Sequence, residues 1–128
     1  MQFRTITLGF GHREKQMESL PVYHGAMSKD TTERLLGGIG RDGSFLIRDS
    51  ESKAGVYCLC VLYKTNVFTY RLYQDEEAFW VLETSPDVQP RCFRHVKNLI
   101  SAFQKPNQGI AMTLLYPVTR DDYKMMLV

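Results

Sequence analysis

The stretch Asp42–Ser52 reads DGSFLIRDSES and decides the fold of this 128-residue chain. Its alternation predicts a strand in which Phe45 and Ile47 face one side of a sheet, while Leu46 and Arg48 face the other. An arginine that shares a face with a core leucine is costly unless an anion or several hydrogen-bond acceptors meet it. This segment alone leaves two interpretations open, a bound anion or a pairing with a nearby acid. The nearby acids are Asp42, Asp49 and Glu51.

Small hydroxyl side chains follow Arg48 in a loop that also offers backbone N–H groups. Ser50 and Ser52 supply these hydroxyls. A phosphate dianion needs a guanidinium group with two parallel donors, small donors beside it and a concave stretch of backbone. The first interpretation is therefore a site for a phosphate-sized anion.

Two more motifs favour the anion. Tyr23–Gly25 reads YHG and Tyr57–Val61 reads YCLCV. Together with FLIRDS at Phe45–Ser50, these motifs make the chain resemble the Src-homology-2 (SH2) family over about Met17–Thr119. The chain is closer still to one branch, the SLAM-associated protein (SAP) family of single-SH2-domain adaptors. The segments similar to that branch are Arg48–Ser52 (RDSES), Gly55–Tyr63 (GVYCLCVLY) and Asn98–Pro106 (NLISAFQKP).

The resemblance implies an α+β fold, the SH2 fold, in which a central antiparallel sheet is flanked by two α-helices. Residue patterns predict a matching order of elements. The first helix follows the N-cap residue Ser28 and ends after Leu36, because Gly37 and Gly38 stop it. The predicted strands are Ser44–Asp49, Val56–Tyr63, Val67–Tyr73, Phe79–Glu83 and Met112–Tyr116, and the second predicted helix is Arg91–Gln104.

The length of the chain is that of one domain. We expect residues 1–16 to be a disordered extension, residues 17–119 the SH2 domain and residues 120–128 a short C-terminal tail. A formal net charge of +2 is too small to indicate general DNA binding. No apolar run is long enough to span a bilayer, and the first residues lack the pattern of a signal peptide. Three cysteines cannot all pair, so reduced cysteines in a cytoplasmic protein are expected. The protein is also expected to be a monomer.

The resemblance also implies a phosphotyrosine site. The family places Arg48 under the phosphate, with Ser50 and Ser52 as donors from the loop. Lys29 takes the position of a second basic residue, although lysine is a point charge and makes a looser contact than arginine. For Lys29 and Arg71 an ordinary solvated charge is the alternative. The expected phosphotyrosine-binding residues are Arg48, Ser50, Glu51, Ser52, Cys58, Arg71 and Lys29.

Specificity is expected to lie on both sides of the tyrosine. In the resembled family the ligand crosses the sheet as an extended strand, and a Val or Ile three residues after the tyrosine enters an apolar pocket. Asn66 stands where the best-known member has an aromatic residue, so the contact before the tyrosine differs there. The expected specificity residues are Glu33, Asn66, Val67, Thr69, Tyr70, Ile100, Leu114 and Tyr116. For Ile100, Leu114 and Tyr116, core packing is the alternative.

Arg94 matches the arginine with which SLAM-associated protein engages the SH3 domain of a Src-family, Fyn-like kinase. The chain has no Pro-x-x-Pro segment, so conventional SH3 docking is unavailable. The alternative for Arg94 is a solvated helix charge. The resemblance thus implies an adaptor that binds Thr-x-Tyr-x-x-Val/Ile motifs, phosphorylated and in part unphosphorylated, in the tails of SLAM-type immune receptors. A protein that only blocks other SH2 proteins is the alternative function.

Other classes of protein fit less well. A tyrosine phosphatase needs a cysteine six residues before an arginine, but here those positions hold Lys64, Asn66 and Asn98. We therefore expect no enzyme and no catalytic residues. An RNA-binding sheet is a distant alternative, because the strands are rich in aromatic residues but lack the glycine and repeated aromatics of its signature. No ligand spacing indicates a metal, and we expect no cofactor, no nucleic-acid partner and no direct membrane insertion.

Overall fold

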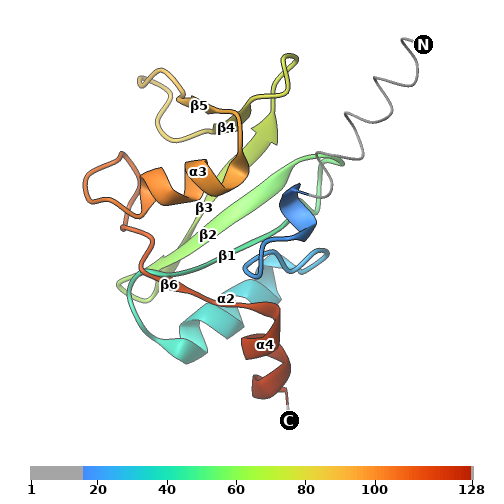
Figure 1. Ribbon diagram of the computed structural model, residues 1–128. Helices are drawn as coiled ribbons and strands as arrows, with labels where there is room; N and C mark the ends of the chain where they lie inside the picture. Colours follow the sequence, from blue (N-terminus) through green and yellow to red (C-terminus); the bar gives the residue numbers. More distant parts are fainter. Residues whose placement is uncertain (1–15, 128) are drawn as a thin grey trace, which may run out of the picture.

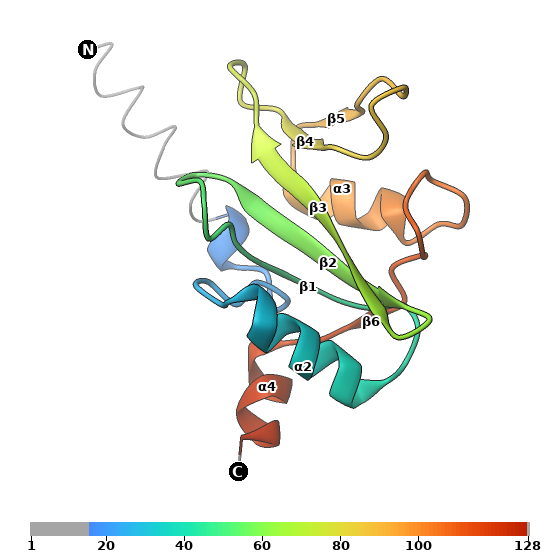
Figure 2. The ribbon, with the colours of Figure 1, turned by 180° about the vertical axis from the view of Figure 1, so that it is seen from behind.

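A six-stranded sheet with the order β5-β4-β3-β2-β1-β6 organises the computed structural model, which describes residues 16–127. Helix α3 covers one side of the sheet, and α2 with α4 lies on the other (Figures 1 and 2). This arrangement confirms the predicted α+β architecture. The elements are α2 (Lys29–Ile39), β1 (Ser44–Asp49), β2 (Tyr57–Tyr63), β3 (Asn66–Gln74), β4 (Trp80–Leu82), β5 (Cys92–Phe93), α3 (Val96–Phe103), β6 (Tyr116–Pro117) and α4 (Arg120–Met126).

Strand β1 separates the two hydrophobic cores as its alternation predicted. Phe45 and Ile47 are buried in the larger core under α3. Leu46 is buried in the smaller core under α2. Strands β1 to β4 fall within one residue of their predicted ends. Because the side chains of a strand alternate, Arg48 lies on the α2 side of the sheet.

The predicted end of the first helix was wrong. Ser28 is the N-cap, and its hydroxyl accepts a hydrogen bond from the Thr31 amide, as predicted. The helix continues through both predicted stop glycines to Ile39 and ends at Gly40, which has a φ of 68°. A glycine ends a helix where the backbone turns left-handed. Among Gly37, Gly38 and Gly40, only Gly40 adopts that conformation.

The second predicted helix began too early. Helix α3 starts at Val96, and Cys92–Phe93 instead forms β5, which pairs antiparallel with β4. Phe93 has the spacing of an inner helical residue, but it packs equally well from a strand opposite Trp80. The edge of β4 has backbone N–H and C=O groups that can pair with this segment. The spacing of apolar residues in the sequence gives no information about such a neighbour.

The end of the chain also departs from the prediction. The last strand, β6, lies at Tyr116–Pro117 and runs parallel to β1, so the sheet is not wholly antiparallel. Residues 120–126 of the expected tail form α4, which begins with a capping box between Thr119 and Asp122. The extension expected to be disordered lies outside the described residues except for Gln16, whose Oε1 accepts hydrogen bonds from Trp80 and Val96. Within residues 16–127 no helix is long and apolar enough to cross a membrane.

Candidate functional site

Arg48 lies near the end of β1 with only 4% of its surface exposed. One guanidinium nitrogen, Nη1, donates a hydrogen bond to the carbonyl of Asp49 at 3.1 Å. The Nε atom is buried and has no hydrogen-bond partner within the described residues. A buried donor without an acceptor costs about 1–3 kcal/mol, and more when it is charged. The side chain is therefore held ready for an acceptor that a ligand can supply.

The nearby acids do not neutralise Arg48. Asp42 accepts a hydrogen bond from the Lys64 amide at 3.0 Å. The Asp49 carboxylate accepts one from the hydroxyl of Tyr23 at 2.6 Å, and Glu51 accepts one from the Lys29 amide at 3.3 Å. No ion pair within residues 16–127 includes Arg48. The pairing of Arg48 with an acid, left open by the sequence, is thus not formed.

Three predicted site residues form a row across the sheet. Arg48 of β1 lies opposite Cys58 of β2, and Cys58 lies opposite Arg71 of β3. Residues directly opposite each other project from the same face. Arg71 is half exposed and makes only a loose ion pair with Glu83, at 3.7 Å. The row therefore has a buried guanidinium at one end, a thiol in the middle and an accessible guanidinium at the other end.

The loop after β1 closes beside this row. The Ser50 amide donates to the carbonyl of Val56 at 2.9 Å. The Ser50 hydroxyl accepts from the Lys53 amide at 3.2 Å and lies 3.5 Å from the Ser52 hydroxyl. A cavity of about 280 Å³ lies between this loop and the start of α2. Its lining residues are Ala26, Met27, Ser28, Asp49, Ser50 and Glu51.

The N-cap residue of α2, Ser28, borders the same cavity, and Lys29 follows it. Lys29 is exposed, and its backbone amide contacts the carboxylate of Glu51. The first turn of a helix carries unpaired N–H groups and a partial positive charge, so an acid is stabilised there. The structure thus brings Lys29, Glu51 and the serine loop together, with the Glu51 carboxylate on the helix end.

The three cysteines, two on β2 and one on β5, are thiols in the structure. Cys58, Cys60 and Cys92 are all free. Burial raises the pKa of Cys60 to about 11, so this thiol stays protonated at neutral pH. No group of three or more His, Cys, Asp or Glu residues in the described part of the chain is arranged to hold a metal ion.

The predicted specificity residues divide into separate regions. Ile100 and Leu114 are buried together in the larger core, against Tyr70. The hydroxyl of Tyr70 accepts a hydrogen bond from the Ala111 amide at 2.7 Å, which ties β3 to the loop after α3. Tyr116 is not with them, because its ring stacks on the guanidinium of Arg41 at 4.3 Å, beside α2 and α4.

The remaining specificity residues lie on β3 and α2. Asn66 and Thr69 are exposed on β3, and Val67 is half buried on the α2 side. Glu33 is exposed on α2, one turn after Lys29. Strand β4 pairs with β3 only from Leu72 onward, so residues 66–70 have β2 as their single strand neighbour among the described elements. An open edge of this kind can accept an extended peptide.

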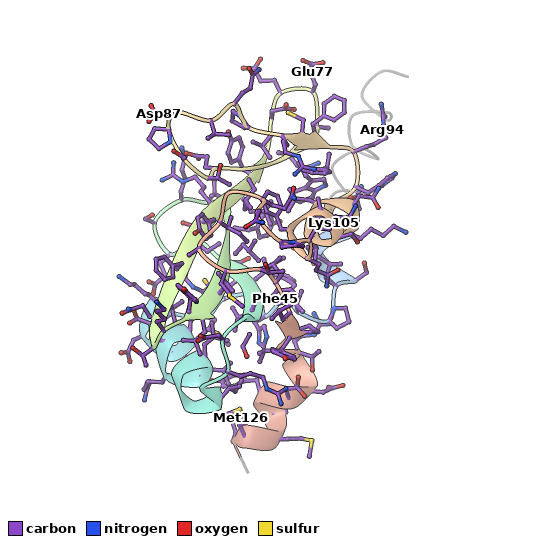
Figure 3. All side chains as sticks on the ribbon, turned by 90° about the vertical axis from the view of Figure 1, so that its left-hand side faces the viewer. Phe45, Glu77, Asp87, Arg94, Lys105 and Met126 are labelled. Carbon is purple, nitrogen blue, oxygen red and sulfur yellow. The ribbon has the colours of Figure 1, made fainter. Side chains whose placement is uncertain are left out.

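Arg94 lies away from the Arg48 site. It precedes α3, on the other side of the sheet from α2, and its guanidinium lies 5.4 Å from the centre of the Phe79 ring. Figure 3 shows Arg94 at the opposite end of the molecule from Met126 of α4. The side chain is exposed and belongs to none of the ion pairs within residues 16–127. It is therefore available as a second contact surface.

Comparisons with known proteins identify the family of the domain. The SH2 domain model matches residues 22–103. The solution structure of the SH2 domain of a CRK/CRKL homologue from Monosiga brevicollis aligns with a TM-score of 0.65 at 26% identity, over 80% of this chain and 89% of that one. Fold and site thus define an SH2 domain protein.

Sequence relatives narrow the class. Human SH2 domain-containing protein 1B is 46% identical over 101 residues, which are 79% of this chain and 76% of that protein. The chain belongs to the SAP family of single-SH2-domain adaptors. A zebrafish phosphatidylinositol 3,4,5-trisphosphate 5-phosphatase 2A is 50% identical over 99 residues, but the chain spans only 8% of its length. The similarity to that phosphatase is limited to this one segment.

Sequence reasoning missed several hydrogen bonds next to the site. Tyr23 was recognised as part of the YHG motif, but no role was assigned to its hydroxyl. Asp49 was considered only as a partner of Arg48. Arg120 fell in the expected tail, although it contacts three backbone carbonyls. The sequence held one signal for the bond between Tyr23 and Asp49, namely a tyrosine in the opening motif and an acid directly after Arg48.

Proposed function

We propose that the chain is a cytoplasmic adaptor that binds phosphotyrosine, with Arg48 as the residue under the phosphate. The observation that carries the proposal is the buried, unpartnered Nε of Arg48. It lies in register with Cys58 and Arg71 and beside the loop of Ser50 and Ser52. This combination suits a phosphate, which carries a charge of about −1.5 to −2 and three acceptor oxygens.

The desolvation of Arg48 favours phosphate binding at this site. The guanidinium loses its water when the protein folds, so a ligand does not have to supply that free energy on binding. A phosphate that meets the guanidinium gains charge-assisted hydrogen bonds worth about 1.5–3 kcal/mol each. Arg71 can leave its exposed pair with Glu83 at little cost, because such pairs contribute about 0–1 kcal/mol. The buried arginine therefore supplies most of the phosphate-dependent affinity, and Arg71 adds a smaller part.

Isothermal titration with a Thr-x-Tyr(P)-x-x-Val peptide tests the proposal. Arg48→Ala should weaken binding about 100-fold or more, since two charge-assisted hydrogen bonds are lost. Arg34→Ala is the matched control, because that exposed arginine pairs only with Asp30 on the surface of α2. Equal affinities of the wild type and Arg48→Ala would refute the assignment.

We also propose that residues beside the tyrosine contribute enough to retain part of the binding without phosphate. The open edge at residues 66–70 and the apolar region of Ile100 and Leu114 support contacts on both sides of the tyrosine. An unphosphorylated Thr-x-Tyr-x-x-Val peptide should bind at high micromolar concentration, and Glu33→Ala should weaken it. Absence of any binding at that concentration would mean that the phosphate is indispensable.

For the cellular role, we propose that the adaptor binds the tails of SLAM-type receptors and recruits a Src-family kinase through Arg94. The separate position of Arg94 supports a second surface that stays accessible while a peptide is bound. In a pull-down, Arg94→Ala should lose the kinase SH3 domain and keep the phosphopeptide. If the wild type captures no SH3 domain, the chain acts as a blocker of other SH2 proteins.

The RNA-binding alternative receives no support from the aromatic residues. Tyr57 and Tyr70 pack against the larger core, and only Phe68 is exposed among the large strand aromatics of β2 and β3. Stacking on bases needs several free rings side by side. We therefore retain peptide recognition as the proposed function of this sheet.

A further inference from the structure

The start of α4 is tied to the segment that leads into the sheet. The Nη1 atom of Arg120 donates to the carbonyls of Tyr23 at 2.7 Å and Leu20 at 3.1 Å, and lies 3.5 Å from that of Glu18. The Arg120 amide donates to the carbonyl of Pro21 at 3.1 Å. The helix dipole disfavours a cation in the first turn, so Arg120 does not stabilise α4 through its charge. The hydrogen bonds to the backbone carbonyls account for the position of its guanidinium instead.

Tyr23 links Arg120 to Asp49, the residue directly before the Ser50 loop. Its carbonyl accepts from Arg120, while its hydroxyl donates to the Asp49 carboxylate at 2.6 Å. The ring is fixed by an edge contact with Tyr57, with 5.7 Å between the ring centres. Burial and the neighbouring Asp49 both raise the pKa of Tyr23, so the phenol remains a donor across the physiological range. The hydroxyl is therefore protonated and able to donate to Asp49 at neutral pH.

Asp49 is the residue at which the buried arginine meets the loop. Its carbonyl accepts from Arg48 Nη1 at 3.1 Å, and its amide donates to the carbonyl of Gly25 at 2.8 Å. Ser50 follows it directly and opens the loop. The side chain of Asp49 thus sets the orientation of a peptide unit that touches the phosphate-binding guanidinium and leads into the serine donors.

We propose that Tyr23 and Arg120 are positioning residues for phosphate recognition, acting through Asp49 on Arg48 and the Ser50 loop. The proposal rests on the proposed function, since it concerns the same anion site. Arg120 lies outside residues 22–103, the part matched by the SH2 model. The C-terminal helix is thereby a functional part of the anion site, although it touches no ligand.

The experiment separates phosphate recognition from peptide binding and from stability. Phenyl phosphate is the probe, because it can reach only the anion site and carries no flanking residues. Its dissociation constant is measured for the intact chain from the shifts of the backbone amide resonances of Ser50 and Ser52, which every variant retains, and that of the phosphopeptide is measured by titration. Tyr23→Phe removes one hydroxyl and keeps the ring. Arg120→Ala removes the tie, Arg120→Lys retains a donor, and Lys124→Ala removes an exposed charge from the same helix.

Tyr23→Phe should weaken both phenyl phosphate and the phosphopeptide by a similar factor of about three to ten, the value of one hydrogen bond that orders a site. Arg120→Ala should weaken both by about threefold, Arg120→Lys should restore most of that loss, and Lys124→Ala should change neither. Thermal melting must show that each variant is folded at the assay temperature.

Unchanged affinity for phenyl phosphate in folded Tyr23→Phe and Arg120→Ala would overturn the proposal. Weaker peptide binding with unchanged phenyl phosphate binding would do so as well, because it would place the effect outside the anion site. Failure of the proposed function looks different: wild type and Arg48→Ala would then bind both probes equally well.

Discussion

The two faces of the sheet differ in how they treat charge: one is a closed apolar core, and the other carries the residues proposed to bind phosphate. Under α3, the strands contribute apolar and aromatic residues to a large core that includes Leu59 and Trp80. Under α2 the core is smaller, and the same strands also place Arg48, Cys58 and Arg71 there. The buried Nε of Arg48 is left without a partner on the second face. The α3 face is fully packed in the free protein, whereas the α2 face keeps an unsatisfied donor that the proposed phosphate ligand would satisfy.

The difference follows from the two-residue period of a strand. In β1, Ile47 points into the larger core and the next residue, Arg48, points to the other side. The packing of Ile47 therefore holds the backbone that carries Arg48. A rigid apolar face makes it possible for the opposite face to keep a charged group in an unfavourable position, because the core supplies the necessary free energy.

The largest expected effect on stability comes from the α3 face. Leu59 has no exposed surface and lies in the larger core. Leu59→Ala should lower the free energy of unfolding by about 2–5 kcal/mol, through lost burial and the cavity that remains. Urea unfolding measures this change, and titration of the folded variant should show phenyl phosphate affinity within about twofold of wild type. A large loss of affinity in the folded variant would show that the two faces do not act separately.

The α2 face should respond in the opposite direction. Arg48→Met fills a similar volume with an apolar side chain and removes the unpartnered donor. In the absence of ligand it should raise the free energy of unfolding by about 1 kcal/mol, because desolvation of the guanidinium is no longer required. Urea unfolding with and without phenyl phosphate checks this: the ligand should stabilise wild type and leave the variant unchanged. A less stable variant would mean that the protein itself satisfies Arg48.

Much of this comparison could be predicted from the sequence. The alternation of Phe45 to Arg48 assigned each side chain to its face, because a strand has only one period. The family motifs indicated Arg48 as the anion residue, which stays a prediction, and the residue patterns gave the succession of strands along the chain. Each of these signals is local in the chain, so one sequence was enough to read them.

The remaining features depend on contacts between distant segments. The end of α2 at Gly40 is set by backbone conformation, whereas the sequence pattern indicated a stop at Gly37 and Gly38. Cys92–Phe93 became a strand because β4 had a free edge. The hydrogen bond between Tyr23 and Asp49 joins residues 26 positions apart, and the contact of Arg120 with Tyr23 spans 97. No local pattern encodes such pairs.

The smallest predicted effect is the pH dependence of stability that His24 causes on the side of the sheet covered by α2 and α4. His24 lies beside α4, where its Nε2 donates to the carbonyl of Val118 at 2.8 Å and its ring contacts Tyr123. Burial lowers the pKa of His24 from 6.5; the nearby Arg120 lowers it further, while the bond to Val118 and the charge of Asp122 oppose the shift. Below pH 6.5 the unfolded chain therefore binds more protons than the folded chain, and stability falls as the pH is lowered.

Unfolding in urea at pH 7.5 and pH 5.5, without ligand, tests this prediction. The free energy of unfolding of wild type should be lower at pH 5.5, and His24→Gln should show a smaller difference between the two conditions, because glutamine does not titrate. His95 is exposed and is present in both proteins, so its contribution cancels in the comparison. The phosphate ligand is left out because it titrates in the same range. The same pH difference in both proteins would assign the effect to other groups, and the face that carries the anion site would then be no more sensitive to acid than the apolar one.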